Sequence, residues 1–323
     1  MSRGHVLVAL GAGSRAGDAA WMNSGVATRV IHLDHAAPSG RRLRSRILGM
    51  GIDSLLIALK AAFSGVRGPV LAANPWVGVS LRLLGWRHVS VTGIYAEAGS
   101  RNHRILRRLL GSSPVVTMVE SEARSWREAG GRAIAVRYGN TLQYPPRVPK
   151  ANSAVRIFVG GSSDRDLQVL EDLIARVQSS QLEVHLTITL DEQPASWSNG
   201  SSTITRTGRL TNSEFGAQMS QADVVFLPLV DGSRAAGHMV AVGALEIGAP
   251  VITTRSGGMD GYVDGTFIAT LDEQADLLDQ LVETGLAWRG RETEVREHWA
   301  REYSLEAYVV RVGEALSQLE AAR

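Results

Sequence analysis

The stretch that most constrains the fold runs from residue 224 to residue 262. The apolar run Val224–Leu229 predicts a buried strand, and a loop of small and polar residues follows it. A helix is expected to begin near Gly237, because apolar residues recur after it at roughly helical spacing. Gly248 and Pro250 end this helix, and Val251–Thr254 predicts a second strand. A strand, a helix and a strand in this order form the repeating unit of a parallel α/β sheet.

The start of the predicted helix has the composition of an anion-binding site. Backbone N–H groups at a helix N-terminus lack intrahelical partners, and the helix dipole adds positive potential there. Small residues before Gly237 allow a phosphate to approach these groups. A second glycine loop, Ser256–Gly258, follows the next strand at the edge where parallel sheets bind ligands. The segment therefore predicts a phosphate or diphosphate site.

Two segments carry a resemblance to a known family. The sequence AGHMVAVGALEIGAPVITT, followed by GYVDG, resembles the nucleotide-sugar segment of GT-B glycosyltransferases, especially those similar to glycosyltransferase family 4. The resemblance extends back to FVGGSSDRDLQVLEDLI at Phe158–Ile174. It implies an α/β fold of two Rossmann-like, doubly wound parallel-sheet domains that face a cleft, with C-terminal helices crossing back to the N-terminal domain. The implied activity is transfer of a sugar from a nucleotide diphosphate sugar, with UDP as the expected nucleotide.

The resemblance also implies roles for individual residues. The donor diphosphate would contact Gly161, Ser162, Arg165, Gly237, His238 and Met239, with Ser233 or Arg234 adding contacts. The nucleobase and ribose would lie near Gly208, Arg209, Leu210 and Glu246, and the sugar near Gly13, Gly257, Gly258 and Asp260.

The sequence departs from the family at one pair of positions. Many family 4 members carry two glutamates eight positions apart in this segment, and Ala235 and Gly243 occupy the matching positions here. Glu246 follows three positions after the second of them. The usual contact to the donor ribose is therefore altered.

Backbone N–H groups and one or two cations can neutralise a departing diphosphate without a metal ion. We therefore expect no metal and no cofactor, since the nucleotide sugar is a substrate. Arg165 is the first candidate for the cation, and the alternative is an ion pair with Asp164 or Asp166 at the start of a helix.

The N-terminal half opens with a strand, His5–Leu10, and the glycine loop Gly11–Gly17. Together with Asp34, this loop leaves open an alternative function, an NAD(P)-dependent oxidoreductase. The only lysines, Lys60 and Lys150, provide no Tyr-Lys catalytic motif for that chemistry. A second alternative is a nucleotide-sugar-binding protein without activity.

An acceptor base would have to come from the N-terminal half and reach the attacking hydroxyl. Glu97 and His103 are the candidates, followed by Asp34. If the reaction retains anomeric configuration, as in family 4 generally, Glu97 could position the substrate instead.

The charge of the chain is divided between its halves. Residues 1–150 contain 21 Lys and Arg against 7 Asp and Glu, a net +14, and residues 151–323 contain 13 against 25, a net −12. The first half is therefore expected to face an anionic partner. We expect an acceptor glycan or a lipid-linked glycan, and an anionic membrane surface that binds Arg41–Arg46 and Arg101–Arg108. Nucleic acid is not expected.

The 323 residues are sufficient for two α/β domains. The charge changes sign near residue 150, and the proline-containing stretch Thr141–Asn152 follows a predicted last strand at Val136–Asn140. We therefore predict an acceptor-side domain over 1–150 and a nucleotide-sugar donor domain over 151–323, ending in a helical region from Trp288. The lack of cysteine, and of a signal peptide or membrane-spanning pattern, favours a cytoplasmic protein. The two basic segments predict that it is peripheral at the inner face of the membrane.

Overall fold

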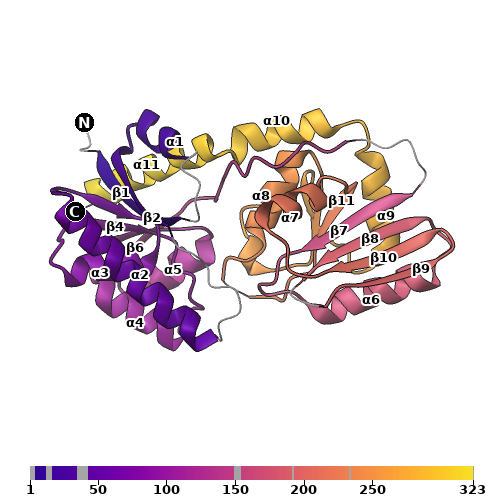
Figure 1. Cartoon of the computed structure of the whole chain (residues 1–323), viewed down its shortest axis with the longest axis horizontal. Coiled ribbons are helices and arrows are strands. Elements are labelled where there is room, and N and C mark those ends of the chain that lie inside the picture. Colours follow the sequence, from indigo (N-terminus) through magenta and orange to yellow (C-terminus); the bar gives the residue numbers. More distant parts are fainter. Residues whose placement is uncertain are drawn as a thin grey trace. The chain divides into compact units, whose positions relative to one another are not determined.

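The computed structural model describes residues 4–11, 17–34, 43–148, 154–190, 193–232 and 234–322. The chain forms two compact units, shown in Figure 1 with colours that follow the sequence. The first unit comprises Met1–Arg137 and Leu305–Arg323, and the second comprises Tyr138–Ser304.

The first unit is a parallel sheet with helices on both faces. Its strand order is β2-β1-β3-β4-β5-β6. The strands are β1 His5–Gly11, β2 Ala27–Asp34, β3 Val70–Ala72, β4 Val89–Thr92, β5 Pro114–Thr117 and β6 Arg132–Ala135. The helices are α1 Asp18–Asn23, α2 Leu43–Phe63, α3 Pro75–Leu83, α4 Arg101–Leu110, α5 Glu120–Glu128 and α11 Leu305–Ala321.

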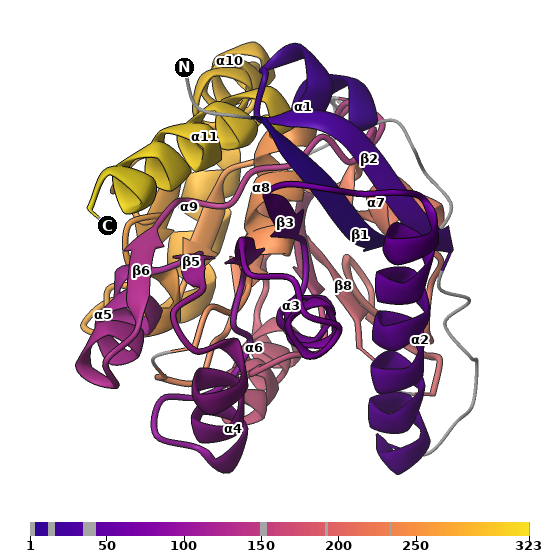
Figure 2. The same cartoon turned by 90° about the vertical axis from the view of Figure 1, so that its left-hand side faces the viewer.

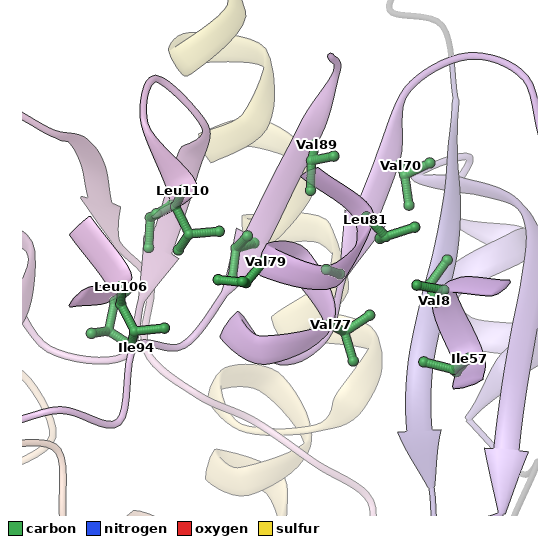
Figure 3. Packing of buried hydrophobic residues seen from close by; sticks show 14 of the residues in the cluster. Val8, Ile57, Val70, Val77, Val79, Leu81, Val89, Ile94, Leu106 and Leu110 are labelled. Carbon is green, nitrogen blue, oxygen red and sulfur yellow. The ribbon is translucent and has the colours of Figure 1, made fainter. Parts of the chain in front are cut away.

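The helices of this unit divide between the two faces of the sheet. Helix α2 packs on α3, and α3 packs on α4, whereas α1 packs on α11. Figure 2 shows α2, α3 and α4 next to one another. Figure 3 shows the core beneath them, where side chains such as Val8, Ile57 and Val70 point into the same apolar layer. This core is continuous from α2 to the strands, because buried residues of α2 and of the strands belong to one apolar cluster.

The second unit is also doubly wound. Its strand order is β13-β12-β11-β7-β8-β10-β9, and all its pairs are parallel except β9–β10. The strands are β7 Val155–Gly160, β8 Val184–Thr189, β9 Ala195–Asn199, β10 Ser202–Thr207, β11 Val224–Leu227, β12 Val251–Thr253 and β13 Ile268–Thr270. The helices are α6 Leu167–Ser179, α7 Asn212–Met219, α8 His238–Ile247, the short 3-10 helix η1 Gly257–Met259, α9 Leu277–Ala287 and α10 Glu292–Glu302.

Three local predictions differ from the structure. The last strand of the first sheet is β6 at Arg132–Ala135, and the predicted strand at Val136–Asn140 is wrong because these residues follow β6 as irregular chain. Strand β9 was missed, since four of its five residues are exposed on a sheet edge and carry no apolar pattern. The helical region after Trp288 is broken at residues 303–304 into α10 and α11.

The predicted interdomain linker belongs largely to the second unit. Backbone N–H groups of Leu142 and Gln143 donate to the Glu246 carboxylate at 3.0 and 2.8 Å. Arg147 is 5% exposed, and its guanidinium contacts Asp223 and Glu292, each at 3.1 Å. These buried contacts hold residues 138–148 in the second unit. The boundary between the units along the chain therefore lies between residues 137 and 138, and the predicted boundary near 150 is wrong.

The end of the chain returns to the first unit. Helix α11 belongs to that unit and packs on β5, β6 and α1, whereas α10 packs on α8 in the second unit. Two Rossmann-like sheets and a returning C-terminal helix agree with the predicted fold class.

Candidate functional site

The topology of the second sheet identifies one edge as the place for a ligand. Strand β7 lies between β11 and β8, and the chain leaves it toward β8 but later returns to β11 on the other side. At such a switch point the loops at the carboxyl ends of two adjacent strands diverge and leave a crevice. The loops concerned are residues 161–166 after β7 and residues 228–237 after β11.

Arg165 supports the first of these loops from beneath. Its Nε and one terminal nitrogen donate to the Gly160 carbonyl at 2.9 and 2.7 Å, and the other terminal nitrogen donates to the Ser163 carbonyl at 2.7 Å. The residue is 8% exposed. Burial lowers the pKa of Arg165 to about 10, and Asp164 opposes this shift, so the guanidinium remains charged at pH 7. It therefore stabilises the loop conformation by hydrogen bonds and places a positive charge next to the loop.

Asp164 and Arg234 join the two loops. Asp164 adopts a left-handed conformation, φ 54°, and its carboxylate accepts hydrogen bonds from the Arg234 guanidinium. The Asp164 carbonyl accepts from the Val230 N–H at 3.0 Å, and the Pro228 carbonyl accepts from the Asp166 N–H at 2.9 Å. The side chain of Arg234 is 33% exposed, so this second cation is reachable from solvent.

The two aspartates beside Arg165 have different partners. Asp164 contacts Arg234, whereas the Asp166 side chain caps α6 by accepting from the N–H groups of Gln168 and Val169. The ion pair predicted as an alternative for Arg165 is instead made by Arg234.

Helix α8 begins shortly after Arg234 in the sequence, without a side-chain cap from the described part of the chain. Its N-cap residue, Gly237, has φ 81°, a left-handed conformation that suits glycine. In the same unit, α6, α7 and α9 are capped by Asp166, Thr211 and Asp276. The first N–H groups of α8, at His238 and Met239, precede the first intrahelical bonds and are suited to an anion.

His238 is buried and neutral at the same helix start. Its ring stacks on Tyr262 with centroids 5.2 Å apart and an interplanar angle of 13°. Burial lowers the pKa of His238 to about 4, and the nearby Arg165 lowers it further while a backbone hydrogen bond opposes the shift. The side chain therefore brings no charge to a phosphate at pH 7; its contribution is to fix the helix start.

The loop after β12 closes against the loop after β11. The Ala236 N–H donates to the Gly258 carbonyl at 3.5 Å, and the Gly257 N–H donates to the Asp231 carboxylate at 3.3 Å. A Cβ at Gly258 would lie 2.3 Å from the Arg234 carbonyl oxygen, so only glycine fits there. Asp260 is exposed at the end of this loop. Gly257, Gly258 and Asp260 thus lie next to the loop that contains Arg234.

The remaining donor-side residues are more dispersed. Gly208, Arg209 and Leu210 lie in the loop after β10, with Arg209 exposed. Ser162 is exposed in the loop after β7, and Met239 is 58% exposed at the start of α8. Gly161 has φ 81°, and a Cβ there would lie 2.5 Å from a guanidinium nitrogen of Arg165. Ser233 lies outside the described residues.

Glu246 does not have the position expected of a ribose contact. It is 6% exposed on α8, and both carboxylate oxygens accept hydrogen bonds from the backbone of residues 142 and 143. Burial raises the pKa of Glu246, and the hydrogen bonds from the backbone oppose the shift. Its carboxylate is used to hold the chain segment next to the unit boundary, a role that no local sequence pattern indicated.

The predicted acceptor-side residues differ in their exposure to solvent. Glu97 is exposed in the loop at the carboxyl end of β4. His103 is 4% exposed, and its ring meets Trp126 edge-on at 5.3 Å. Burial in this core removes His103 from the groups that an acceptor hydroxyl can reach. Gly13, most of the Gly11–Gly17 loop and the side chain of Asp34 lie outside the described residues.

Sequence reasoning missed the aromatic support of the site. Tyr262 is fully buried, stacks on His238 and also on Tyr303 at 6.1 Å, and its hydroxyl accepts from the Tyr138 N–H at 2.6 Å. These residues are separated by up to 165 positions, so their proximity leaves no local pattern in the sequence.

Comparisons with known proteins agree with this geometry. Residues 153–284 match the protein family described as glycosyl transferases group 1. No curated protein matches the chain. Among solved structures, sucrose-phosphate synthase from Thermosynechococcus elongatus has a TM-score of 0.63 at 18% identity, over 90% of this chain and 84% of that one.

Two further solved structures are similar over nearly the whole chain. HepE from Anabaena in complex with UDP has a TM-score of 0.63 at 13% identity, over 97% of this chain and 100% of that one. The trehalose 6-phosphate synthase from Burkholderia multivorans has a TM-score of 0.60 at 12% identity, over 100% of both chains. The fold is GT-B, and the predicted enzyme class, a glycosyltransferase, is confirmed. Assignment to family 4 stays a prediction.

Proposed function

We propose that this glycosyltransferase takes its sugar from a nucleoside diphosphate sugar, with UDP as the nucleotide, bound at the carboxyl edge of the second sheet. The observation that carries the proposal is the uncapped start of α8 beside two cations, Arg165 and Arg234. An uncapped helix start and nearby guanidinium groups stabilise the charge of a diphosphate. The complexes of Anabaena HepE with UDP and with UDP-glucose support the choice of nucleotide.

The chemistry follows from where charge develops. When the bond between the sugar and the diphosphate breaks, negative charge grows on the leaving oxygen. The N–H groups of His238 and Met239 and the guanidinium of Arg234 stabilise this charge without moving, because the surrounding loops are already joined by hydrogen bonds. In this proposal no metal ion or cofactor is needed.

The acceptor side rests on fewer observations. Glu97 is the remaining candidate to position or deprotonate the acceptor hydroxyl, because it is exposed at the carboxyl end of β4. The net +14 of residues 1–150 favours an acceptor that is anionic or presented at an anionic lipid surface, as for a lipid-linked glycan or a growing polysaccharide. In this proposal the enzyme works in the cytoplasm at the inner face of the membrane. No helix in the described part of the chain is long and apolar enough to cross a membrane.

Thermal unfolding with a panel of nucleotides tests the donor. UDP, GDP, dTDP, ADP and NAD are compared, each with and without EDTA. A ligand at about 100 times its Kd stabilises the folded state by about 2.7 kcal/mol. We expect UDP to raise the Tm most, with or without EDTA. Stabilisation by NAD alone, or a strict requirement for a divalent cation, would contradict the proposal.

A further inference from the structure

The outer face of α2 is apolar and exposed. Its inner face packs into the first unit through Ile57, Ala58 and Ala61, which are fully buried. On the opposite face the exposed fractions are 52% for Ile52, 44% for Leu55, 48% for Leu56 and 89% for Phe63. A helix that is apolar on all sides is normally covered on all sides. In the part of the chain that the structure describes, one side of α2 is left exposed.

These residues form a single stripe. Positions 52, 55, 56, 59 and 63 follow the spacing of one helix face, and half-buried Leu59 completes the row. At 1.5 Å per residue the stripe is about 16 Å long. Asp53 and Lys60 lie outside it, so the stripe contains no charged side chain. Contiguous apolar surface of this kind usually marks an interaction site.

The chemistry around the stripe distinguishes the partners that could cover it. Residues 35–42 of the same chain, HAAPSGRR, contain no large aliphatic or aromatic side chain. A second copy would bring together two halves that each carry net +14 over residues 1–150, which repel each other. An anionic lipid surface offers both an apolar layer and negative charge.

Basic residues precede the stripe in the sequence, and others are exposed on α4 in the same helix layer. Arg44 and Arg46 lie in the first turn of α2, and the sequence before them adds Arg41 and Arg42. Helix α4 carries exposed Arg101, Arg104 and Arg108, and α3 lies between α4 and α2 (Figure 2). Near an anionic membrane each such residue strengthens attraction, and this attraction is screened by salt.

We propose that α2 docks on an anionic bilayer, with Ile52, Leu56 and Phe63 buried among the lipids and the exposed arginines of α4 at the headgroups. The helix lies in the plane of the surface, because its other face is part of the protein core. The docking adds to the proposed function the lipid surface at which the acceptor is presented. The presentation of an acceptor there rests on the proposed function, whereas the binding of α2 to lipid does not.

Vesicle co-sedimentation of the full chain tests the docking. Vesicles of phosphatidylcholine with 30% phosphatidylglycerol are compared with phosphatidylcholine alone, at about 0.05 and about 0.5 M salt. The variant replaces three stripe residues: Ile52→Gln, Leu56→Gln and Phe63→Gln. The matched control replaces two exposed apolar residues of the second unit, Leu167→Gln and Leu286→Gln, which are 56% and 47% exposed. We expect at least tenfold weaker binding of the stripe variant to anionic vesicles and no change for the control.

A fluorescent label gives a second readout that does not depend on removing the stripe. The chain has no cysteine, so Phe63→Cys provides a single labelling position, and Leu167→Cys is its control. On anionic vesicles, a label at position 63 should be quenched by lipid-borne quenchers, and one at position 167 should not.

Several outcomes would overturn the proposal. If the wild type stays in the supernatant with anionic vesicles at low salt, there is no docking. If the stripe variant sediments equally well and the label at position 63 is not quenched, the arginines alone bind lipid. A wild-type dimer that the stripe variant dissociates, without vesicle binding, would make a second copy the partner. The Tm increase caused by UDP is measured separately on every variant, so failure of docking is distinguishable from failure of the donor site.

Discussion

Arg165 shows how one buried charge can serve both stability and binding. Its guanidinium satisfies two loop carbonyls and remains protonated beneath the proposed diphosphate site. Hydrogen bonds that involve a charged group contribute about 1.5–3 kcal/mol each, more than neutral ones. The sequence prediction assigned Arg165 to direct phosphate contact; the structure adds that it braces the loop.

Replacing Arg165 should therefore affect both properties. For Arg165→Ala we expect a lower Tm and at least tenfold weaker UDP binding by calorimetry. The matched control is Arg206→Ala, which breaks an exposed ion pair with Glu171 worth less than about 1 kcal/mol. If Arg165→Ala has the Tm and the UDP affinity of the wild type, neither the hydrogen bonds of Arg165 nor its positive charge is needed at this loop.

His238 gives the second unit a predictable response to acid. Its folded-state pKa of about 4 lies below the unfolded value of 6.5, so between these values the unfolded chain binds a proton that the native state does not. The contribution of His238 to stability is thus present above pH 6.5 and lost as pH falls toward 4. Between pH 7 and pH 5 this amounts to about 2 kcal/mol.

The variant His238→Phe keeps an aromatic ring against Tyr262 but does not titrate. We expect its free energy of unfolding to fall about 2 kcal/mol less than that of the wild type between pH 7 and pH 5. Replacement of an exposed histidine, His88→Asn, is the control, and chemical denaturation at each pH is the measurement. Parallel losses in wild type and His238→Phe would show that His238 is readily protonated in the native state.

At the scale of elements, the site depends on three loops that contact one another through their backbones. At Gly258 the contact leaves no room for a side chain. Helix α8 starts where the loops after β7, β11 and β12 are joined by backbone hydrogen bonds. Because these loops also carry Arg165, Arg234 and Gly258, a shift in one of them moves the groups proposed to contact the diphosphate.

A Cβ at Gly258 tests this dependence. In Gly258→Ala the new atom would meet the Arg234 carbonyl oxygen at 2.3 Å, and forced repacking of this kind costs about 1–3 kcal/mol. We expect a lower Tm and weaker UDP binding. Gly232→Ala is the control, because a Cβ there has no neighbour within 4 Å among the described residues. Equal UDP affinities of the two variants would show that the loop after β12 does not shape the site.

At the scale of the whole molecule, a buried ion cluster and Glu246 hold residues 138–148 in the second unit. Arg147, Asp223, Glu292 and Arg289 form an ion cluster in the second unit, with the Arg147 side chain 1% exposed. Burial lowers the pKa of Arg147, and Asp223 and Glu292 oppose the shift. Together with Glu246, this cluster anchors the segment that leads from the first unit.

Breaking the cluster should destabilise the second unit. Removing one partner of a buried ion pair typically costs about 3–5 kcal/mol, because the other charge is left uncompensated. For Arg147→Ala we expect the calorimetric transition of the second unit to move to lower temperature. Arg176→Ala, which removes exposed ion pairs with Asp172 and Asp276, should change little. An unchanged transition in Arg147→Ala would mean that the segment is held by other contacts.

The sequence alone determined the two parallel sheets, the start of α8 and the glycine-rich loops beside it. Each of these depends on local patterns: apolar runs, helical spacing, and residues that end helices or permit left-handed backbone. Residue counts showed the opposite charges of the two halves, and the resemblance of two segments to GT-B glycosyltransferases implied the enzyme class.

Only the tertiary structure decided the rest. It assigned residues 138–148 to the second unit, buried His103, turned Glu246 toward the backbone of residues 142 and 143, and left the α2 stripe exposed. The physical reason is the same in each case. Burial and pairing arise from contacts between residues far apart in the chain, and residue type and spacing do not specify which distant partner a side chain meets.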